Sequence, residues 1–438
     1  MKKLFFSFFV VLQSIISFAQ NKDKETVNLV ITKVSVVSME RDEILKNQDV
    51  VIIDGKIVSI TKFKESIYKN ILRIDGTGKF IMPSLSDAHV HFPETEVEME
   101  QILQLNLING VTKLRSMRGD WKHAEWRNKF NSAESFYPKL YLSSPPISRS
   151  YDLTPEEIES FVKASKENGF DLVKILSIKS QAIFSQLDSV CKKYNMPFGG
   201  HFPKLASGNQ LNDDVVFNSN YTSFEHLGGL AGETDAVLTK RIAFLKDRNT
   251  TICPTLSWYS IGSGRYSLDE SRNLLGMEFV SKMKMEEWIA GTIKYREKIG
   301  DEAYKAEVVS EMKTLDEKYK IVKKLHDAGV NMILSPDASG KYMIAGFGVL
   351  GEMQLLKNAN LSNFDVLKMS TVNFAKFFKE SYGTIEVGKA ADFIILDKNP
   401  LEDLNALKDI KGVYFNNQFL EESKLKEMRL NLLRNIEN

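Results

Sequence analysis

Short hydrophobic runs alternate with polar stretches of helical length through the middle of the chain. We predict strands at these runs and helices between them, because a bounded run of about four to eight apolar residues is typical of a buried strand. The clearest helix start is Thr154-Pro155-Glu156-Glu157, which supplies an N-cap, a first-turn proline and early acids for a helix over residues 154–168. The predicted strands lie at residues 84–91, 111–115, 139–142, 171–176, 196–201, 221–226, 250–255 and 330–337.

This alternation predicts an α/β fold of the (β/α)8, or TIM-barrel, type, because parallel strands need helical crossovers between them. It assigns residues 83–382 to the barrel. A stretch from about 257 to 320, rich in Met, Lys and Glu, follows the seventh strand. We predict a helical insertion there, which serves either as a lid over the barrel mouth or as a helical pair that only covers the barrel.

Both ends of the remaining chain have short, strand-like segments with tight turns. Residues 27–72 contain a predicted hairpin closed by Asp54-Gly55. Residues 383–397 and 412–420 have the same pattern of short strand-like runs and tight turns. Short strands with tight turns indicate a small β-sandwich or open sheet. Since neither end is large enough to stand alone, we predict one β domain, a small β-sandwich, built from residues 20–82 and 383–438.

The N-terminus has the pattern of a signal peptide. Lys2-Lys3 precede an apolar segment over residues 4–18, which ends in Ser17-Phe18-Ala19 and gives way to a polar run. The segment is shorter than the roughly 20 residues of a spanning helix, and no cysteine follows it for lipid attachment. We therefore predict a signal peptide at 1–19, cleaved near Ala19, and an exported protein, periplasmic or secreted, with no stable membrane anchor.

Charge and cysteine content narrow the class of partner. The 438 residues contain 58 basic and 57 acidic side chains, which gives no reason to expect nucleic acid as a partner. A small-molecule substrate in a pocket is the expectation, and the oligomeric state is left open, a homo-oligomer included. Cys191 and Cys253 are too few for a disulfide framework. We expect buried free thiols, although the two could pair in an oxidising compartment.

Six side chains with metal-binding chemistry lie at the ends of predicted strands, where barrel enzymes carry their active sites. Each has a simpler explanation by itself: a core histidine, a helix-capping aspartate, or a lysine whose amine reaches solvent. This simpler explanation fits Lys174 least well. Its ammonium would lie inside the apolar run Leu172-Val-Lys-Ile-Leu176, where burial of an uncompensated charge costs several kcal/mol of folding free energy. The six residues are His89, His91, Lys174, His201, His226 and Asp337.

The order His-x-His, Lys, His, His, Asp on successive strands resembles the amidohydrolase superfamily in its binuclear form. It is similar to the imidazolonepropionase-like and prolidase-like metal-dependent hydrolases. The resemblance extends to Gly199-Gly-His201-Phe-Pro203, to Ser223-Phe-Glu-His226-Leu227 and to the closing segment 383–403, and it covers nearly the whole chain after the predicted signal peptide.

The resemblance implies a ligand set and a reaction. His89 and His91 would hold one metal ion together with Asp337, and His201 and His226 a second. Lys174, carboxylated by CO2, would bridge the two ions. Zinc is the expected metal, with manganese, cobalt or iron as substitutes. A hydroxide between the ions would attack the scissile carbonyl of a small amide, dipeptide or N-acyl amino acid, while Asp337 acts as general base and then as general acid.

Four further residues are candidates for binding a substrate carboxylate, because they follow predicted strand ends and carry cationic or phenolic groups. They are Arg115, Arg118, Arg149 and Tyr151.

Three alternatives stay open beside the amide hydrolase. A lactonase or esterase would use the same site. A mononuclear deaminase is disfavoured, because such members of the superfamily typically lack the bridging lysine and carry an acid three residues beyond the fifth-strand histidine, where this chain has Lys204. A binding protein without catalysis would have no reason to keep a full ligand set.

Overall fold

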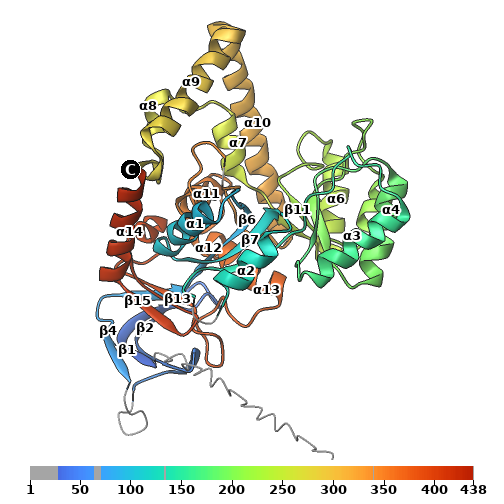
Figure 1. Cartoon of the computed structure of the whole chain (residues 1–438). Helices are drawn as coiled ribbons and strands as arrows, with labels where there is room; N and C mark the ends of the chain where they lie inside the picture. Colours follow the sequence, from blue (N-terminus) through green and yellow to red (C-terminus); the bar gives the residue numbers. More distant parts are fainter. Residues whose placement is uncertain (1–27, 64–70, 133–134, 339, 438) are drawn as a thin grey trace, which may run out of the picture.

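A computed structural model gives the arrangement of the chain in space. It describes residues 28–63, 71–132, 135–338 and 340–437 (Figure 1). The predicted signal peptide, residues 1–19, lies outside these ranges and stays a prediction. None of the helices in the described part has both the length and the apolar content needed to cross a bilayer.

Strands from both terminal segments form one mixed sheet, at the lower left of Figure 1. The order is β15-β14-β13-β5-β1-β2-β3, and β4 pairs with β1 as well. The strands are β1 (Leu29–Val37), β2 (Ile44–Ile53), β3 (Lys56–Ile60), β4 (Leu72–Asp75), β5 (Phe80–Pro83), β13 (Phe393–Leu396), β14 (Ile410–Phe415) and β15 (Gln418–Glu421).

This terminal sheet curls around a core of its own. β5 runs parallel to β1 on one side and antiparallel to β13 on the other. At the far edge, the backbone N–H of Ile57 donates to Lys389 O at 3.0 Å, so β3 lies beside the stretch that precedes β13. Ile31, Ile52 and Phe393 belong to the enclosed core. Strands from both terminal segments therefore form one curled sheet, where the sequence predicted a small β-sandwich or open sheet.

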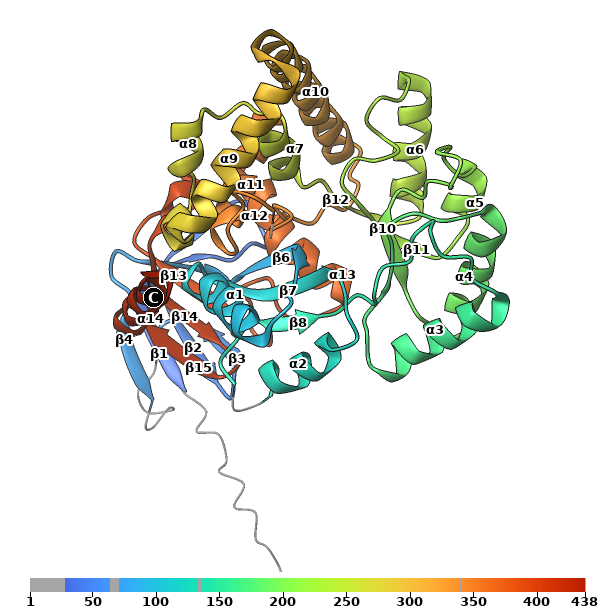
Figure 2. The same cartoon turned by 45° about the horizontal axis from the view of Figure 1, so that its top comes forward.

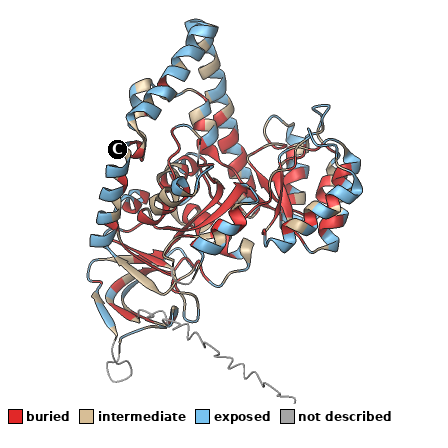
Figure 3. Cartoon of the chain, viewed as in Figure 1, coloured by how far each residue is buried: buried red, intermediate tan, exposed pale blue. Residues whose placement is uncertain are grey.

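The central strands form two parallel sheets, of three and four strands. Their residues are largely buried (Figure 3), as expected of parallel strands covered on both faces. The first sheet holds β6 (Leu85–His91), β7 (Val111–Arg118) and β8 (Lys139–Tyr141), and the second holds β9 (Val173–Ile175), β10 (Phe198–His201), β11 (Tyr221–Glu225) and β12 (Thr251–Cys253).

Backbone hydrogen bonds cross both gaps between the two parallel sheets. After β8, the N–H of Ser144 donates to Leu172 O at 2.9 Å, just before β9. On the other side, residues 331–338 bridge to β12 and to β6, where the N–H of Ala88 donates to Leu334 O at 3.0 Å. The α/β class is as predicted, with the strands assigned to two sheets and not to one closed barrel.

Helices follow most of the central strands and lie outside the two parallel sheets (Figure 2). The predicted helix over 154–168 is confirmed as α3, which begins with the expected cap: Thr154 Oγ1 accepts from the Glu157 N–H at 3.2 Å, and Glu157 Oε2 accepts from the Thr154 N–H at 2.8 Å. The helices are α1 (Glu96–Ile108), α2 (His123–Phe130), α3 (Pro155–Glu167), α4 (Gln181–Lys193), α5 (Asp213–Phe217), α6 (Asp235–Asp247), α11 (Phe347–Asn358), α12 (Asn363–Ser370), α13 (Val372–Phe378), α14 (Glu422–Glu437) and the 3-10 helix η2 (Leu404–Lys408).

The stretch predicted as an insertion is helical throughout most of its length, and its longest helices project as a hairpin at the top of Figure 1. Ile289 is buried in α9, whereas most of that helix is open to solvent. Whether the hairpin serves as a lid stays a prediction. The elements are α7 (Leu256–Gly262), α8 (Leu268–Arg272), the 3-10 helix η1 (Met277–Phe279), α9 (Lys282–Ile299) and α10 (Asp301–Asp327).

Cys191 and Cys253 are both buried free thiols, as predicted. Burial raises the pKa of the Cys191 thiol to about 12. Since the thiolate is the reactive form, burial and the raised pKa both disfavour reaction of this thiol near neutral pH.

Glu352 of α11 fastens the start of α7 to the rest of the fold. Its buried carboxylate accepts from the Leu256 N–H, the Ser257 N–H and the Ser257 hydroxyl, each at 2.7 Å. We expect Glu352→Gln to lower the free energy of unfolding by about 2–3 kcal/mol, because an amide NH2 would face these donors in a buried place. Chemical denaturation at pH 8 measures the change, since burial raises the pKa of Glu352 to about 7.

The control is Glu311→Gln on the exposed part of α10, for which we expect a change of less than about 0.5 kcal/mol. Equal stability losses in the two variants would show that the Glu352 contacts do not hold α7.

Candidate metal centre

The predicted ligands come from separate strands but converge at one edge of the parallel sheets. The carboxyl ends of neighbouring parallel strands meet at the same edge, so side chains placed there are brought together. Their positions are His89 and His91 on β6, Lys174 on β9, His201 as the last residue of β10, His226 directly after β11, and Asp337 near the end of the segment 331–338.

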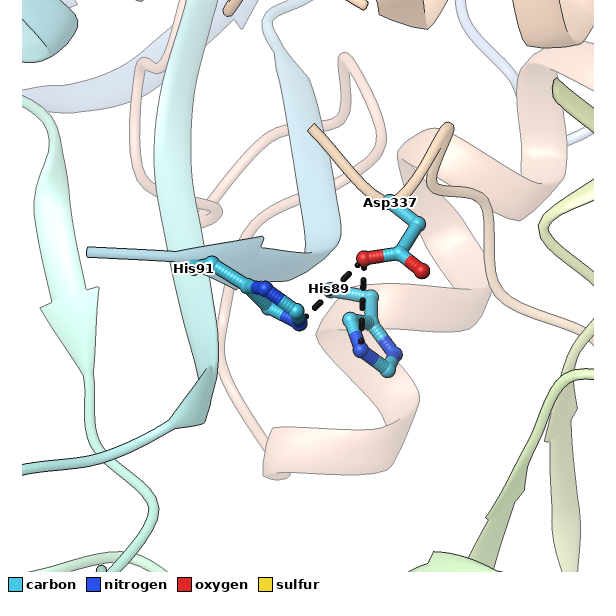
Figure 4. A group of neighbouring side chains, drawn as sticks. All are labelled: His89, His91 and Asp337. Carbon is cyan, nitrogen blue, oxygen red and sulfur yellow. Dashed lines mark ion pairs between the residues drawn. The ribbon is translucent and has the colours of Figure 1, made fainter. Parts of the chain in front are cut away.

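Three imidazoles direct Nε2 at one carboxylate. Asp337 Oδ1 lies 3.3 Å from His91 Nε2 and 3.6 Å from His89 Nε2 (Figure 4), and Asp337 Oδ2 lies 3.9 Å from His226 Nε2. The ligand atoms of His89, His91 and Asp337 all lie within 4.8 Å of one another. Two imidazole nitrogens and one carboxylate oxygen in this arrangement fit a divalent transition-metal ion.

The other predicted histidines complete a cluster of four rings. The ring centroid of His226 is 5.0 Å from that of His89 and 4.8 Å from that of His201. Burial, reinforced by the nearby Lys174 charge, lowers the pKa of His91 to about 4 and that of His226 to about 4. The rings are therefore neutral near pH 7, which leaves each with one nitrogen lone pair to offer a metal.

Lys174 is buried beside this cluster, with 1% of its surface exposed. Its Nζ has no hydrogen-bond partner within the described part of the chain. Burial lowers the pKa of the amine to about 8, although the carboxylates of Glu225 and Asp337 act in the opposite direction. A buried amine left unpartnered is costly, so a structural role alone does not account for it.

Two of the predicted ligands have a left-handed backbone. φ is +63° at His226 and +66° at Asp337, a region that costs a non-glycine residue roughly 1–2 kcal/mol. Successive residues of a regular strand point to opposite faces. The turn at His226 changes this, so that Glu225 and His226 both reach the cluster. Such strain at a ligand position is typical of functional sites.

Two imidazoles are oriented by hydrogen-bond partners that were not predicted from the sequence. His89 Nδ1 lies 2.8 Å from Glu225 Oε2, and His226 Nδ1 lies 2.6 Å from Thr255 Oγ1. Glu225 is buried, with 1% of its surface exposed. The signal was present in Ser223-Phe-Glu-His226, where an acid occurs inside a strand and directly before a predicted ligand.

Asp87 is a second buried acid near the cluster, and it was not predicted from the sequence as a site residue. Its Oδ1 accepts from the Ser335 hydroxyl at 2.5 Å. Burial raises the pKa of Asp87 to about 6, against the lowering effect of this hydrogen bond. Asp87 therefore ties β6 to the segment that carries Asp337.

The prediction that Arg115 binds a substrate carboxylate is wrong. Its side chain is fully buried, Nη2 donates to both oxygens of Glu225 at 2.7 and 2.8 Å, and Nε donates to Ala88 O at 2.5 Å. The guanidinium is therefore engaged by protein groups and is a partner of Glu225, in place of the predicted partner of a substrate carboxylate.

The other predicted substrate residues are exposed. Arg118 ends β7, and its charge contributes to lowering the pKa of His91, so it lies near the cluster. Arg149 and Tyr151 lie in the loop between β8 and α3. Their role in substrate binding stays a prediction.

Comparisons with known proteins place this geometry in context. A family model described as "Amidohydrolase family" matches residues 80–419. Two solved structures share the fold: a bottromycin amidohydrolase (TM-score 0.75, 18% identity, covering 94% of this chain and 91% of that one) and a Xaa-Pro dipeptidase with bound methionine in its active site (TM-score 0.66, 19% identity, covering 90% and 100%). A 5-methylthioadenosine/S-adenosylhomocysteine deaminase from Caldanaerobacter subterraneus subsp. tengcongensis is 23% identical over 420 residues, 85% of each chain.

Proposed function

The chain belongs to the amidohydrolase family, as its motifs predicted, and we propose that it is a metal-dependent hydrolase. We propose that it cleaves a carbon–nitrogen bond of a small amide, dipeptide or N-acyl amino acid. The observation that carries this proposal is the unpartnered, buried amine of Lys174 beside four imidazoles and a carboxylate. A chain that only kept the fold would have no reason to keep this costly group.

We also infer that the two parallel sheets and residues 331–338 form one (β/α)8 barrel. Support comes from the parallel direction of every pairing within these sheets and from the hydrogen bonds across both gaps. In such a barrel the carboxyl ends of all strands meet at one rim, which accounts for the convergence of ligands from distant parts of the sequence.

We propose that the donor set holds two divalent metal ions. His89, His91 and Asp337 would hold one, and His201 and His226 the other. The neutral amine of Lys174 would add to the carbon of CO2 and lose a proton, which would give a carbamate whose single negative charge is shared by two oxygens that could serve as metal ligands. Zinc suits such nitrogen and oxygen donors best.

When bound, the metal ions would supply Lewis acidity and an activated water at neutral pH. The chain's own groups perform the proton transfers. Asp337 is the carboxylate faced by three imidazole Nε2 atoms, which places it to accept a proton from the attacking water and to return that proton to the leaving amine. His89 and Lys174 are both buried, so these two groups lie away from bulk water.

A deaminase is the second candidate, because the curated relative described above has that activity. Lys174, and Lys204 three residues beyond His201, argue against it, because deaminases of this superfamily typically lack the bridging lysine and carry an acid at the second position. Export to the periplasm or medium remains part of the proposal, and a mature protein that begins near residue 20 would support it.

A substrate panel tests the reaction class. Metal-loaded protein is assayed on dipeptides, N-acyl amino acids, lactones and adenine nucleosides. We expect release of the amine from an amide substrate, and a loss of at least about 100-fold in rate after chelation, restored by zinc. Ammonia release from nucleosides with one metal per chain would favour the deaminase, and turnover of lactones alone would favour the esterase.

A further inference from the structure

We propose that Glu225, held by Arg115, is a positioning residue that fixes the His89 ring with Nε2 facing the metal position. This inference rests on the proposed metal centre. It assigns a role to a buried ion pair that the proposed reaction itself does not use.

The contact between His89 and Glu225 decides which ring nitrogen carries hydrogen. His89 Nδ1 lies 2.8 Å from Glu225 Oε2, and both side chains are buried. Both oxygens of Glu225 accept from the Arg115 guanidinium, and a carboxylate paired in this way accepts hydrogen bonds, so Nδ1 donates. A neutral ring then has its lone pair on Nε2, the nitrogen that lies 3.6 Å from Asp337 Oδ1. Glu225 thus selects the tautomer that can bind a metal on the side of Asp337.

Arg115 pairs with the Glu225 carboxylate and holds it in place. Its Nη2 donates to both carboxylate oxygens, at 2.7 and 2.8 Å. Its Nε donates to Ala88 O at 2.5 Å, so the guanidinium is tied to the residue that precedes His89. The Ser223 hydroxyl donates to Glu225 Oε1 at 3.0 Å. A buried carboxylate is costly unless it is paired and hydrogen-bonded, and these contacts supply both.

The equivalent contact of His226 shows what is particular to Glu225. Thr255 Oγ1 lies 2.6 Å from His226 Nδ1. A hydroxyl can donate or accept, so it leaves the tautomer of His226 unspecified. The carboxylate beside His89 allows one arrangement only, and its negative charge also makes the ring a stronger donor to a cation.

The test compares Glu225→Gln with the wild-type chain and with Glu352→Gln. Both substitutions replace a buried carboxylate by an amide, but Glu352 holds α7. We expect Glu225→Gln to weaken zinc binding, measured by competition with a chromophoric chelator, by about 10- to 100-fold. Glu352→Gln should lose stability and keep its zinc affinity. Nitrogen-15 NMR of the metal-free wild-type protein should show His89 protonated at Nδ1.

Two results would overturn the inference: an Nε2–H tautomer of His89 in the wild-type protein, or unchanged zinc affinity and tautomer in Glu225→Gln. If Glu225→Gln does not fold because Arg115 is left without its partner, the double variant Glu225→Gln/Arg115→Met is tested instead, since it also removes the unpaired charge of Arg115. The wild-type tautomer decides the question even if neither variant folds. A wild-type chain that binds no divalent ion would instead overturn the proposed metal centre.

Discussion

Asp337→Asn is expected to lower kcat by about 1,000-fold or more while the chain remains folded. The carboxamide cannot accept the proton of the attacking water, nor can it return one to the leaving amine. Asparagine has nearly the same shape, and it is one of the few residues that tolerate the left-handed backbone found at this position, where φ is +66°. The loss should therefore appear in turnover and not in stability.

Steady-state kinetics on the best substrate of the panel, together with thermal unfolding, measure this effect. Asp316→Asn, an exposed position on α10, is the matched control, and its kcat should equal that of the wild type. Metal content must be measured in parallel, because Asp337 is also a proposed ligand. A variant with full metal content and undiminished kcat would show that another group moves the proton.

The relatives point to two chemistries, and particular residues discriminate between them. One curated relative is a deaminase, whereas the solved structures include a dipeptidase and a bottromycin amidohydrolase. Each is less than 25% identical to this chain, so the structural matches establish the fold and leave the substrate open. The choice depends on Lys174, whose buried amine suits a bridging carbamate, and on Lys204, which stands where a deaminase would carry an acid.

The candidate ligands could be predicted from sequence because the histidines and Asp337 lie at the ends of short apolar runs and Lys174 lies inside one. A strand end has a fixed position in an α/β fold, so His89, Lys174 and Asp337 could be placed near one another although they are far apart in the chain. The structure brings these groups together at one edge of the parallel sheets. The helix boundary at Thr154 was predictable for a local reason, since the capping residues are neighbours in sequence.

The features that were missed depend on contacts between distant residues. Arg115 looked like a substrate residue because a cation after a strand is usually exposed, yet its partners Ala88 and Glu225 come from two other strands. The curled terminal sheet depends on a hydrogen bond between Ile57 and Lys389. Periodicity specifies which face of a strand is apolar, but it does not specify which strand lies beside it.

If the proposed binuclear centre is right, Lys174→Ala should reduce the metal content from two ions per chain to one or none. It should also lower kcat by about 1,000-fold or more, because the carbamate oxygens that would serve as metal ligands are lost. Metal content is measured by mass spectrometry. Wild-type protein prepared with 13C-labelled bicarbonate should show a carbamate carbon by NMR, and the variant should lack it.

Lys113→Met is the matched control for this variant, because Lys113 is an equally buried lysine whose Nζ is satisfied by Asp392 Oδ2 at 2.7 Å. It should lose stability, since Asp392 is left without its partner, and should keep both its metal content and the labelled carbon. The comparison separates the loss of any buried lysine from the loss of a ligand. Full turnover and two ions per chain in Lys174→Ala would remove the bridging role of this residue, and with it the observation on which the hydrolase proposal rests.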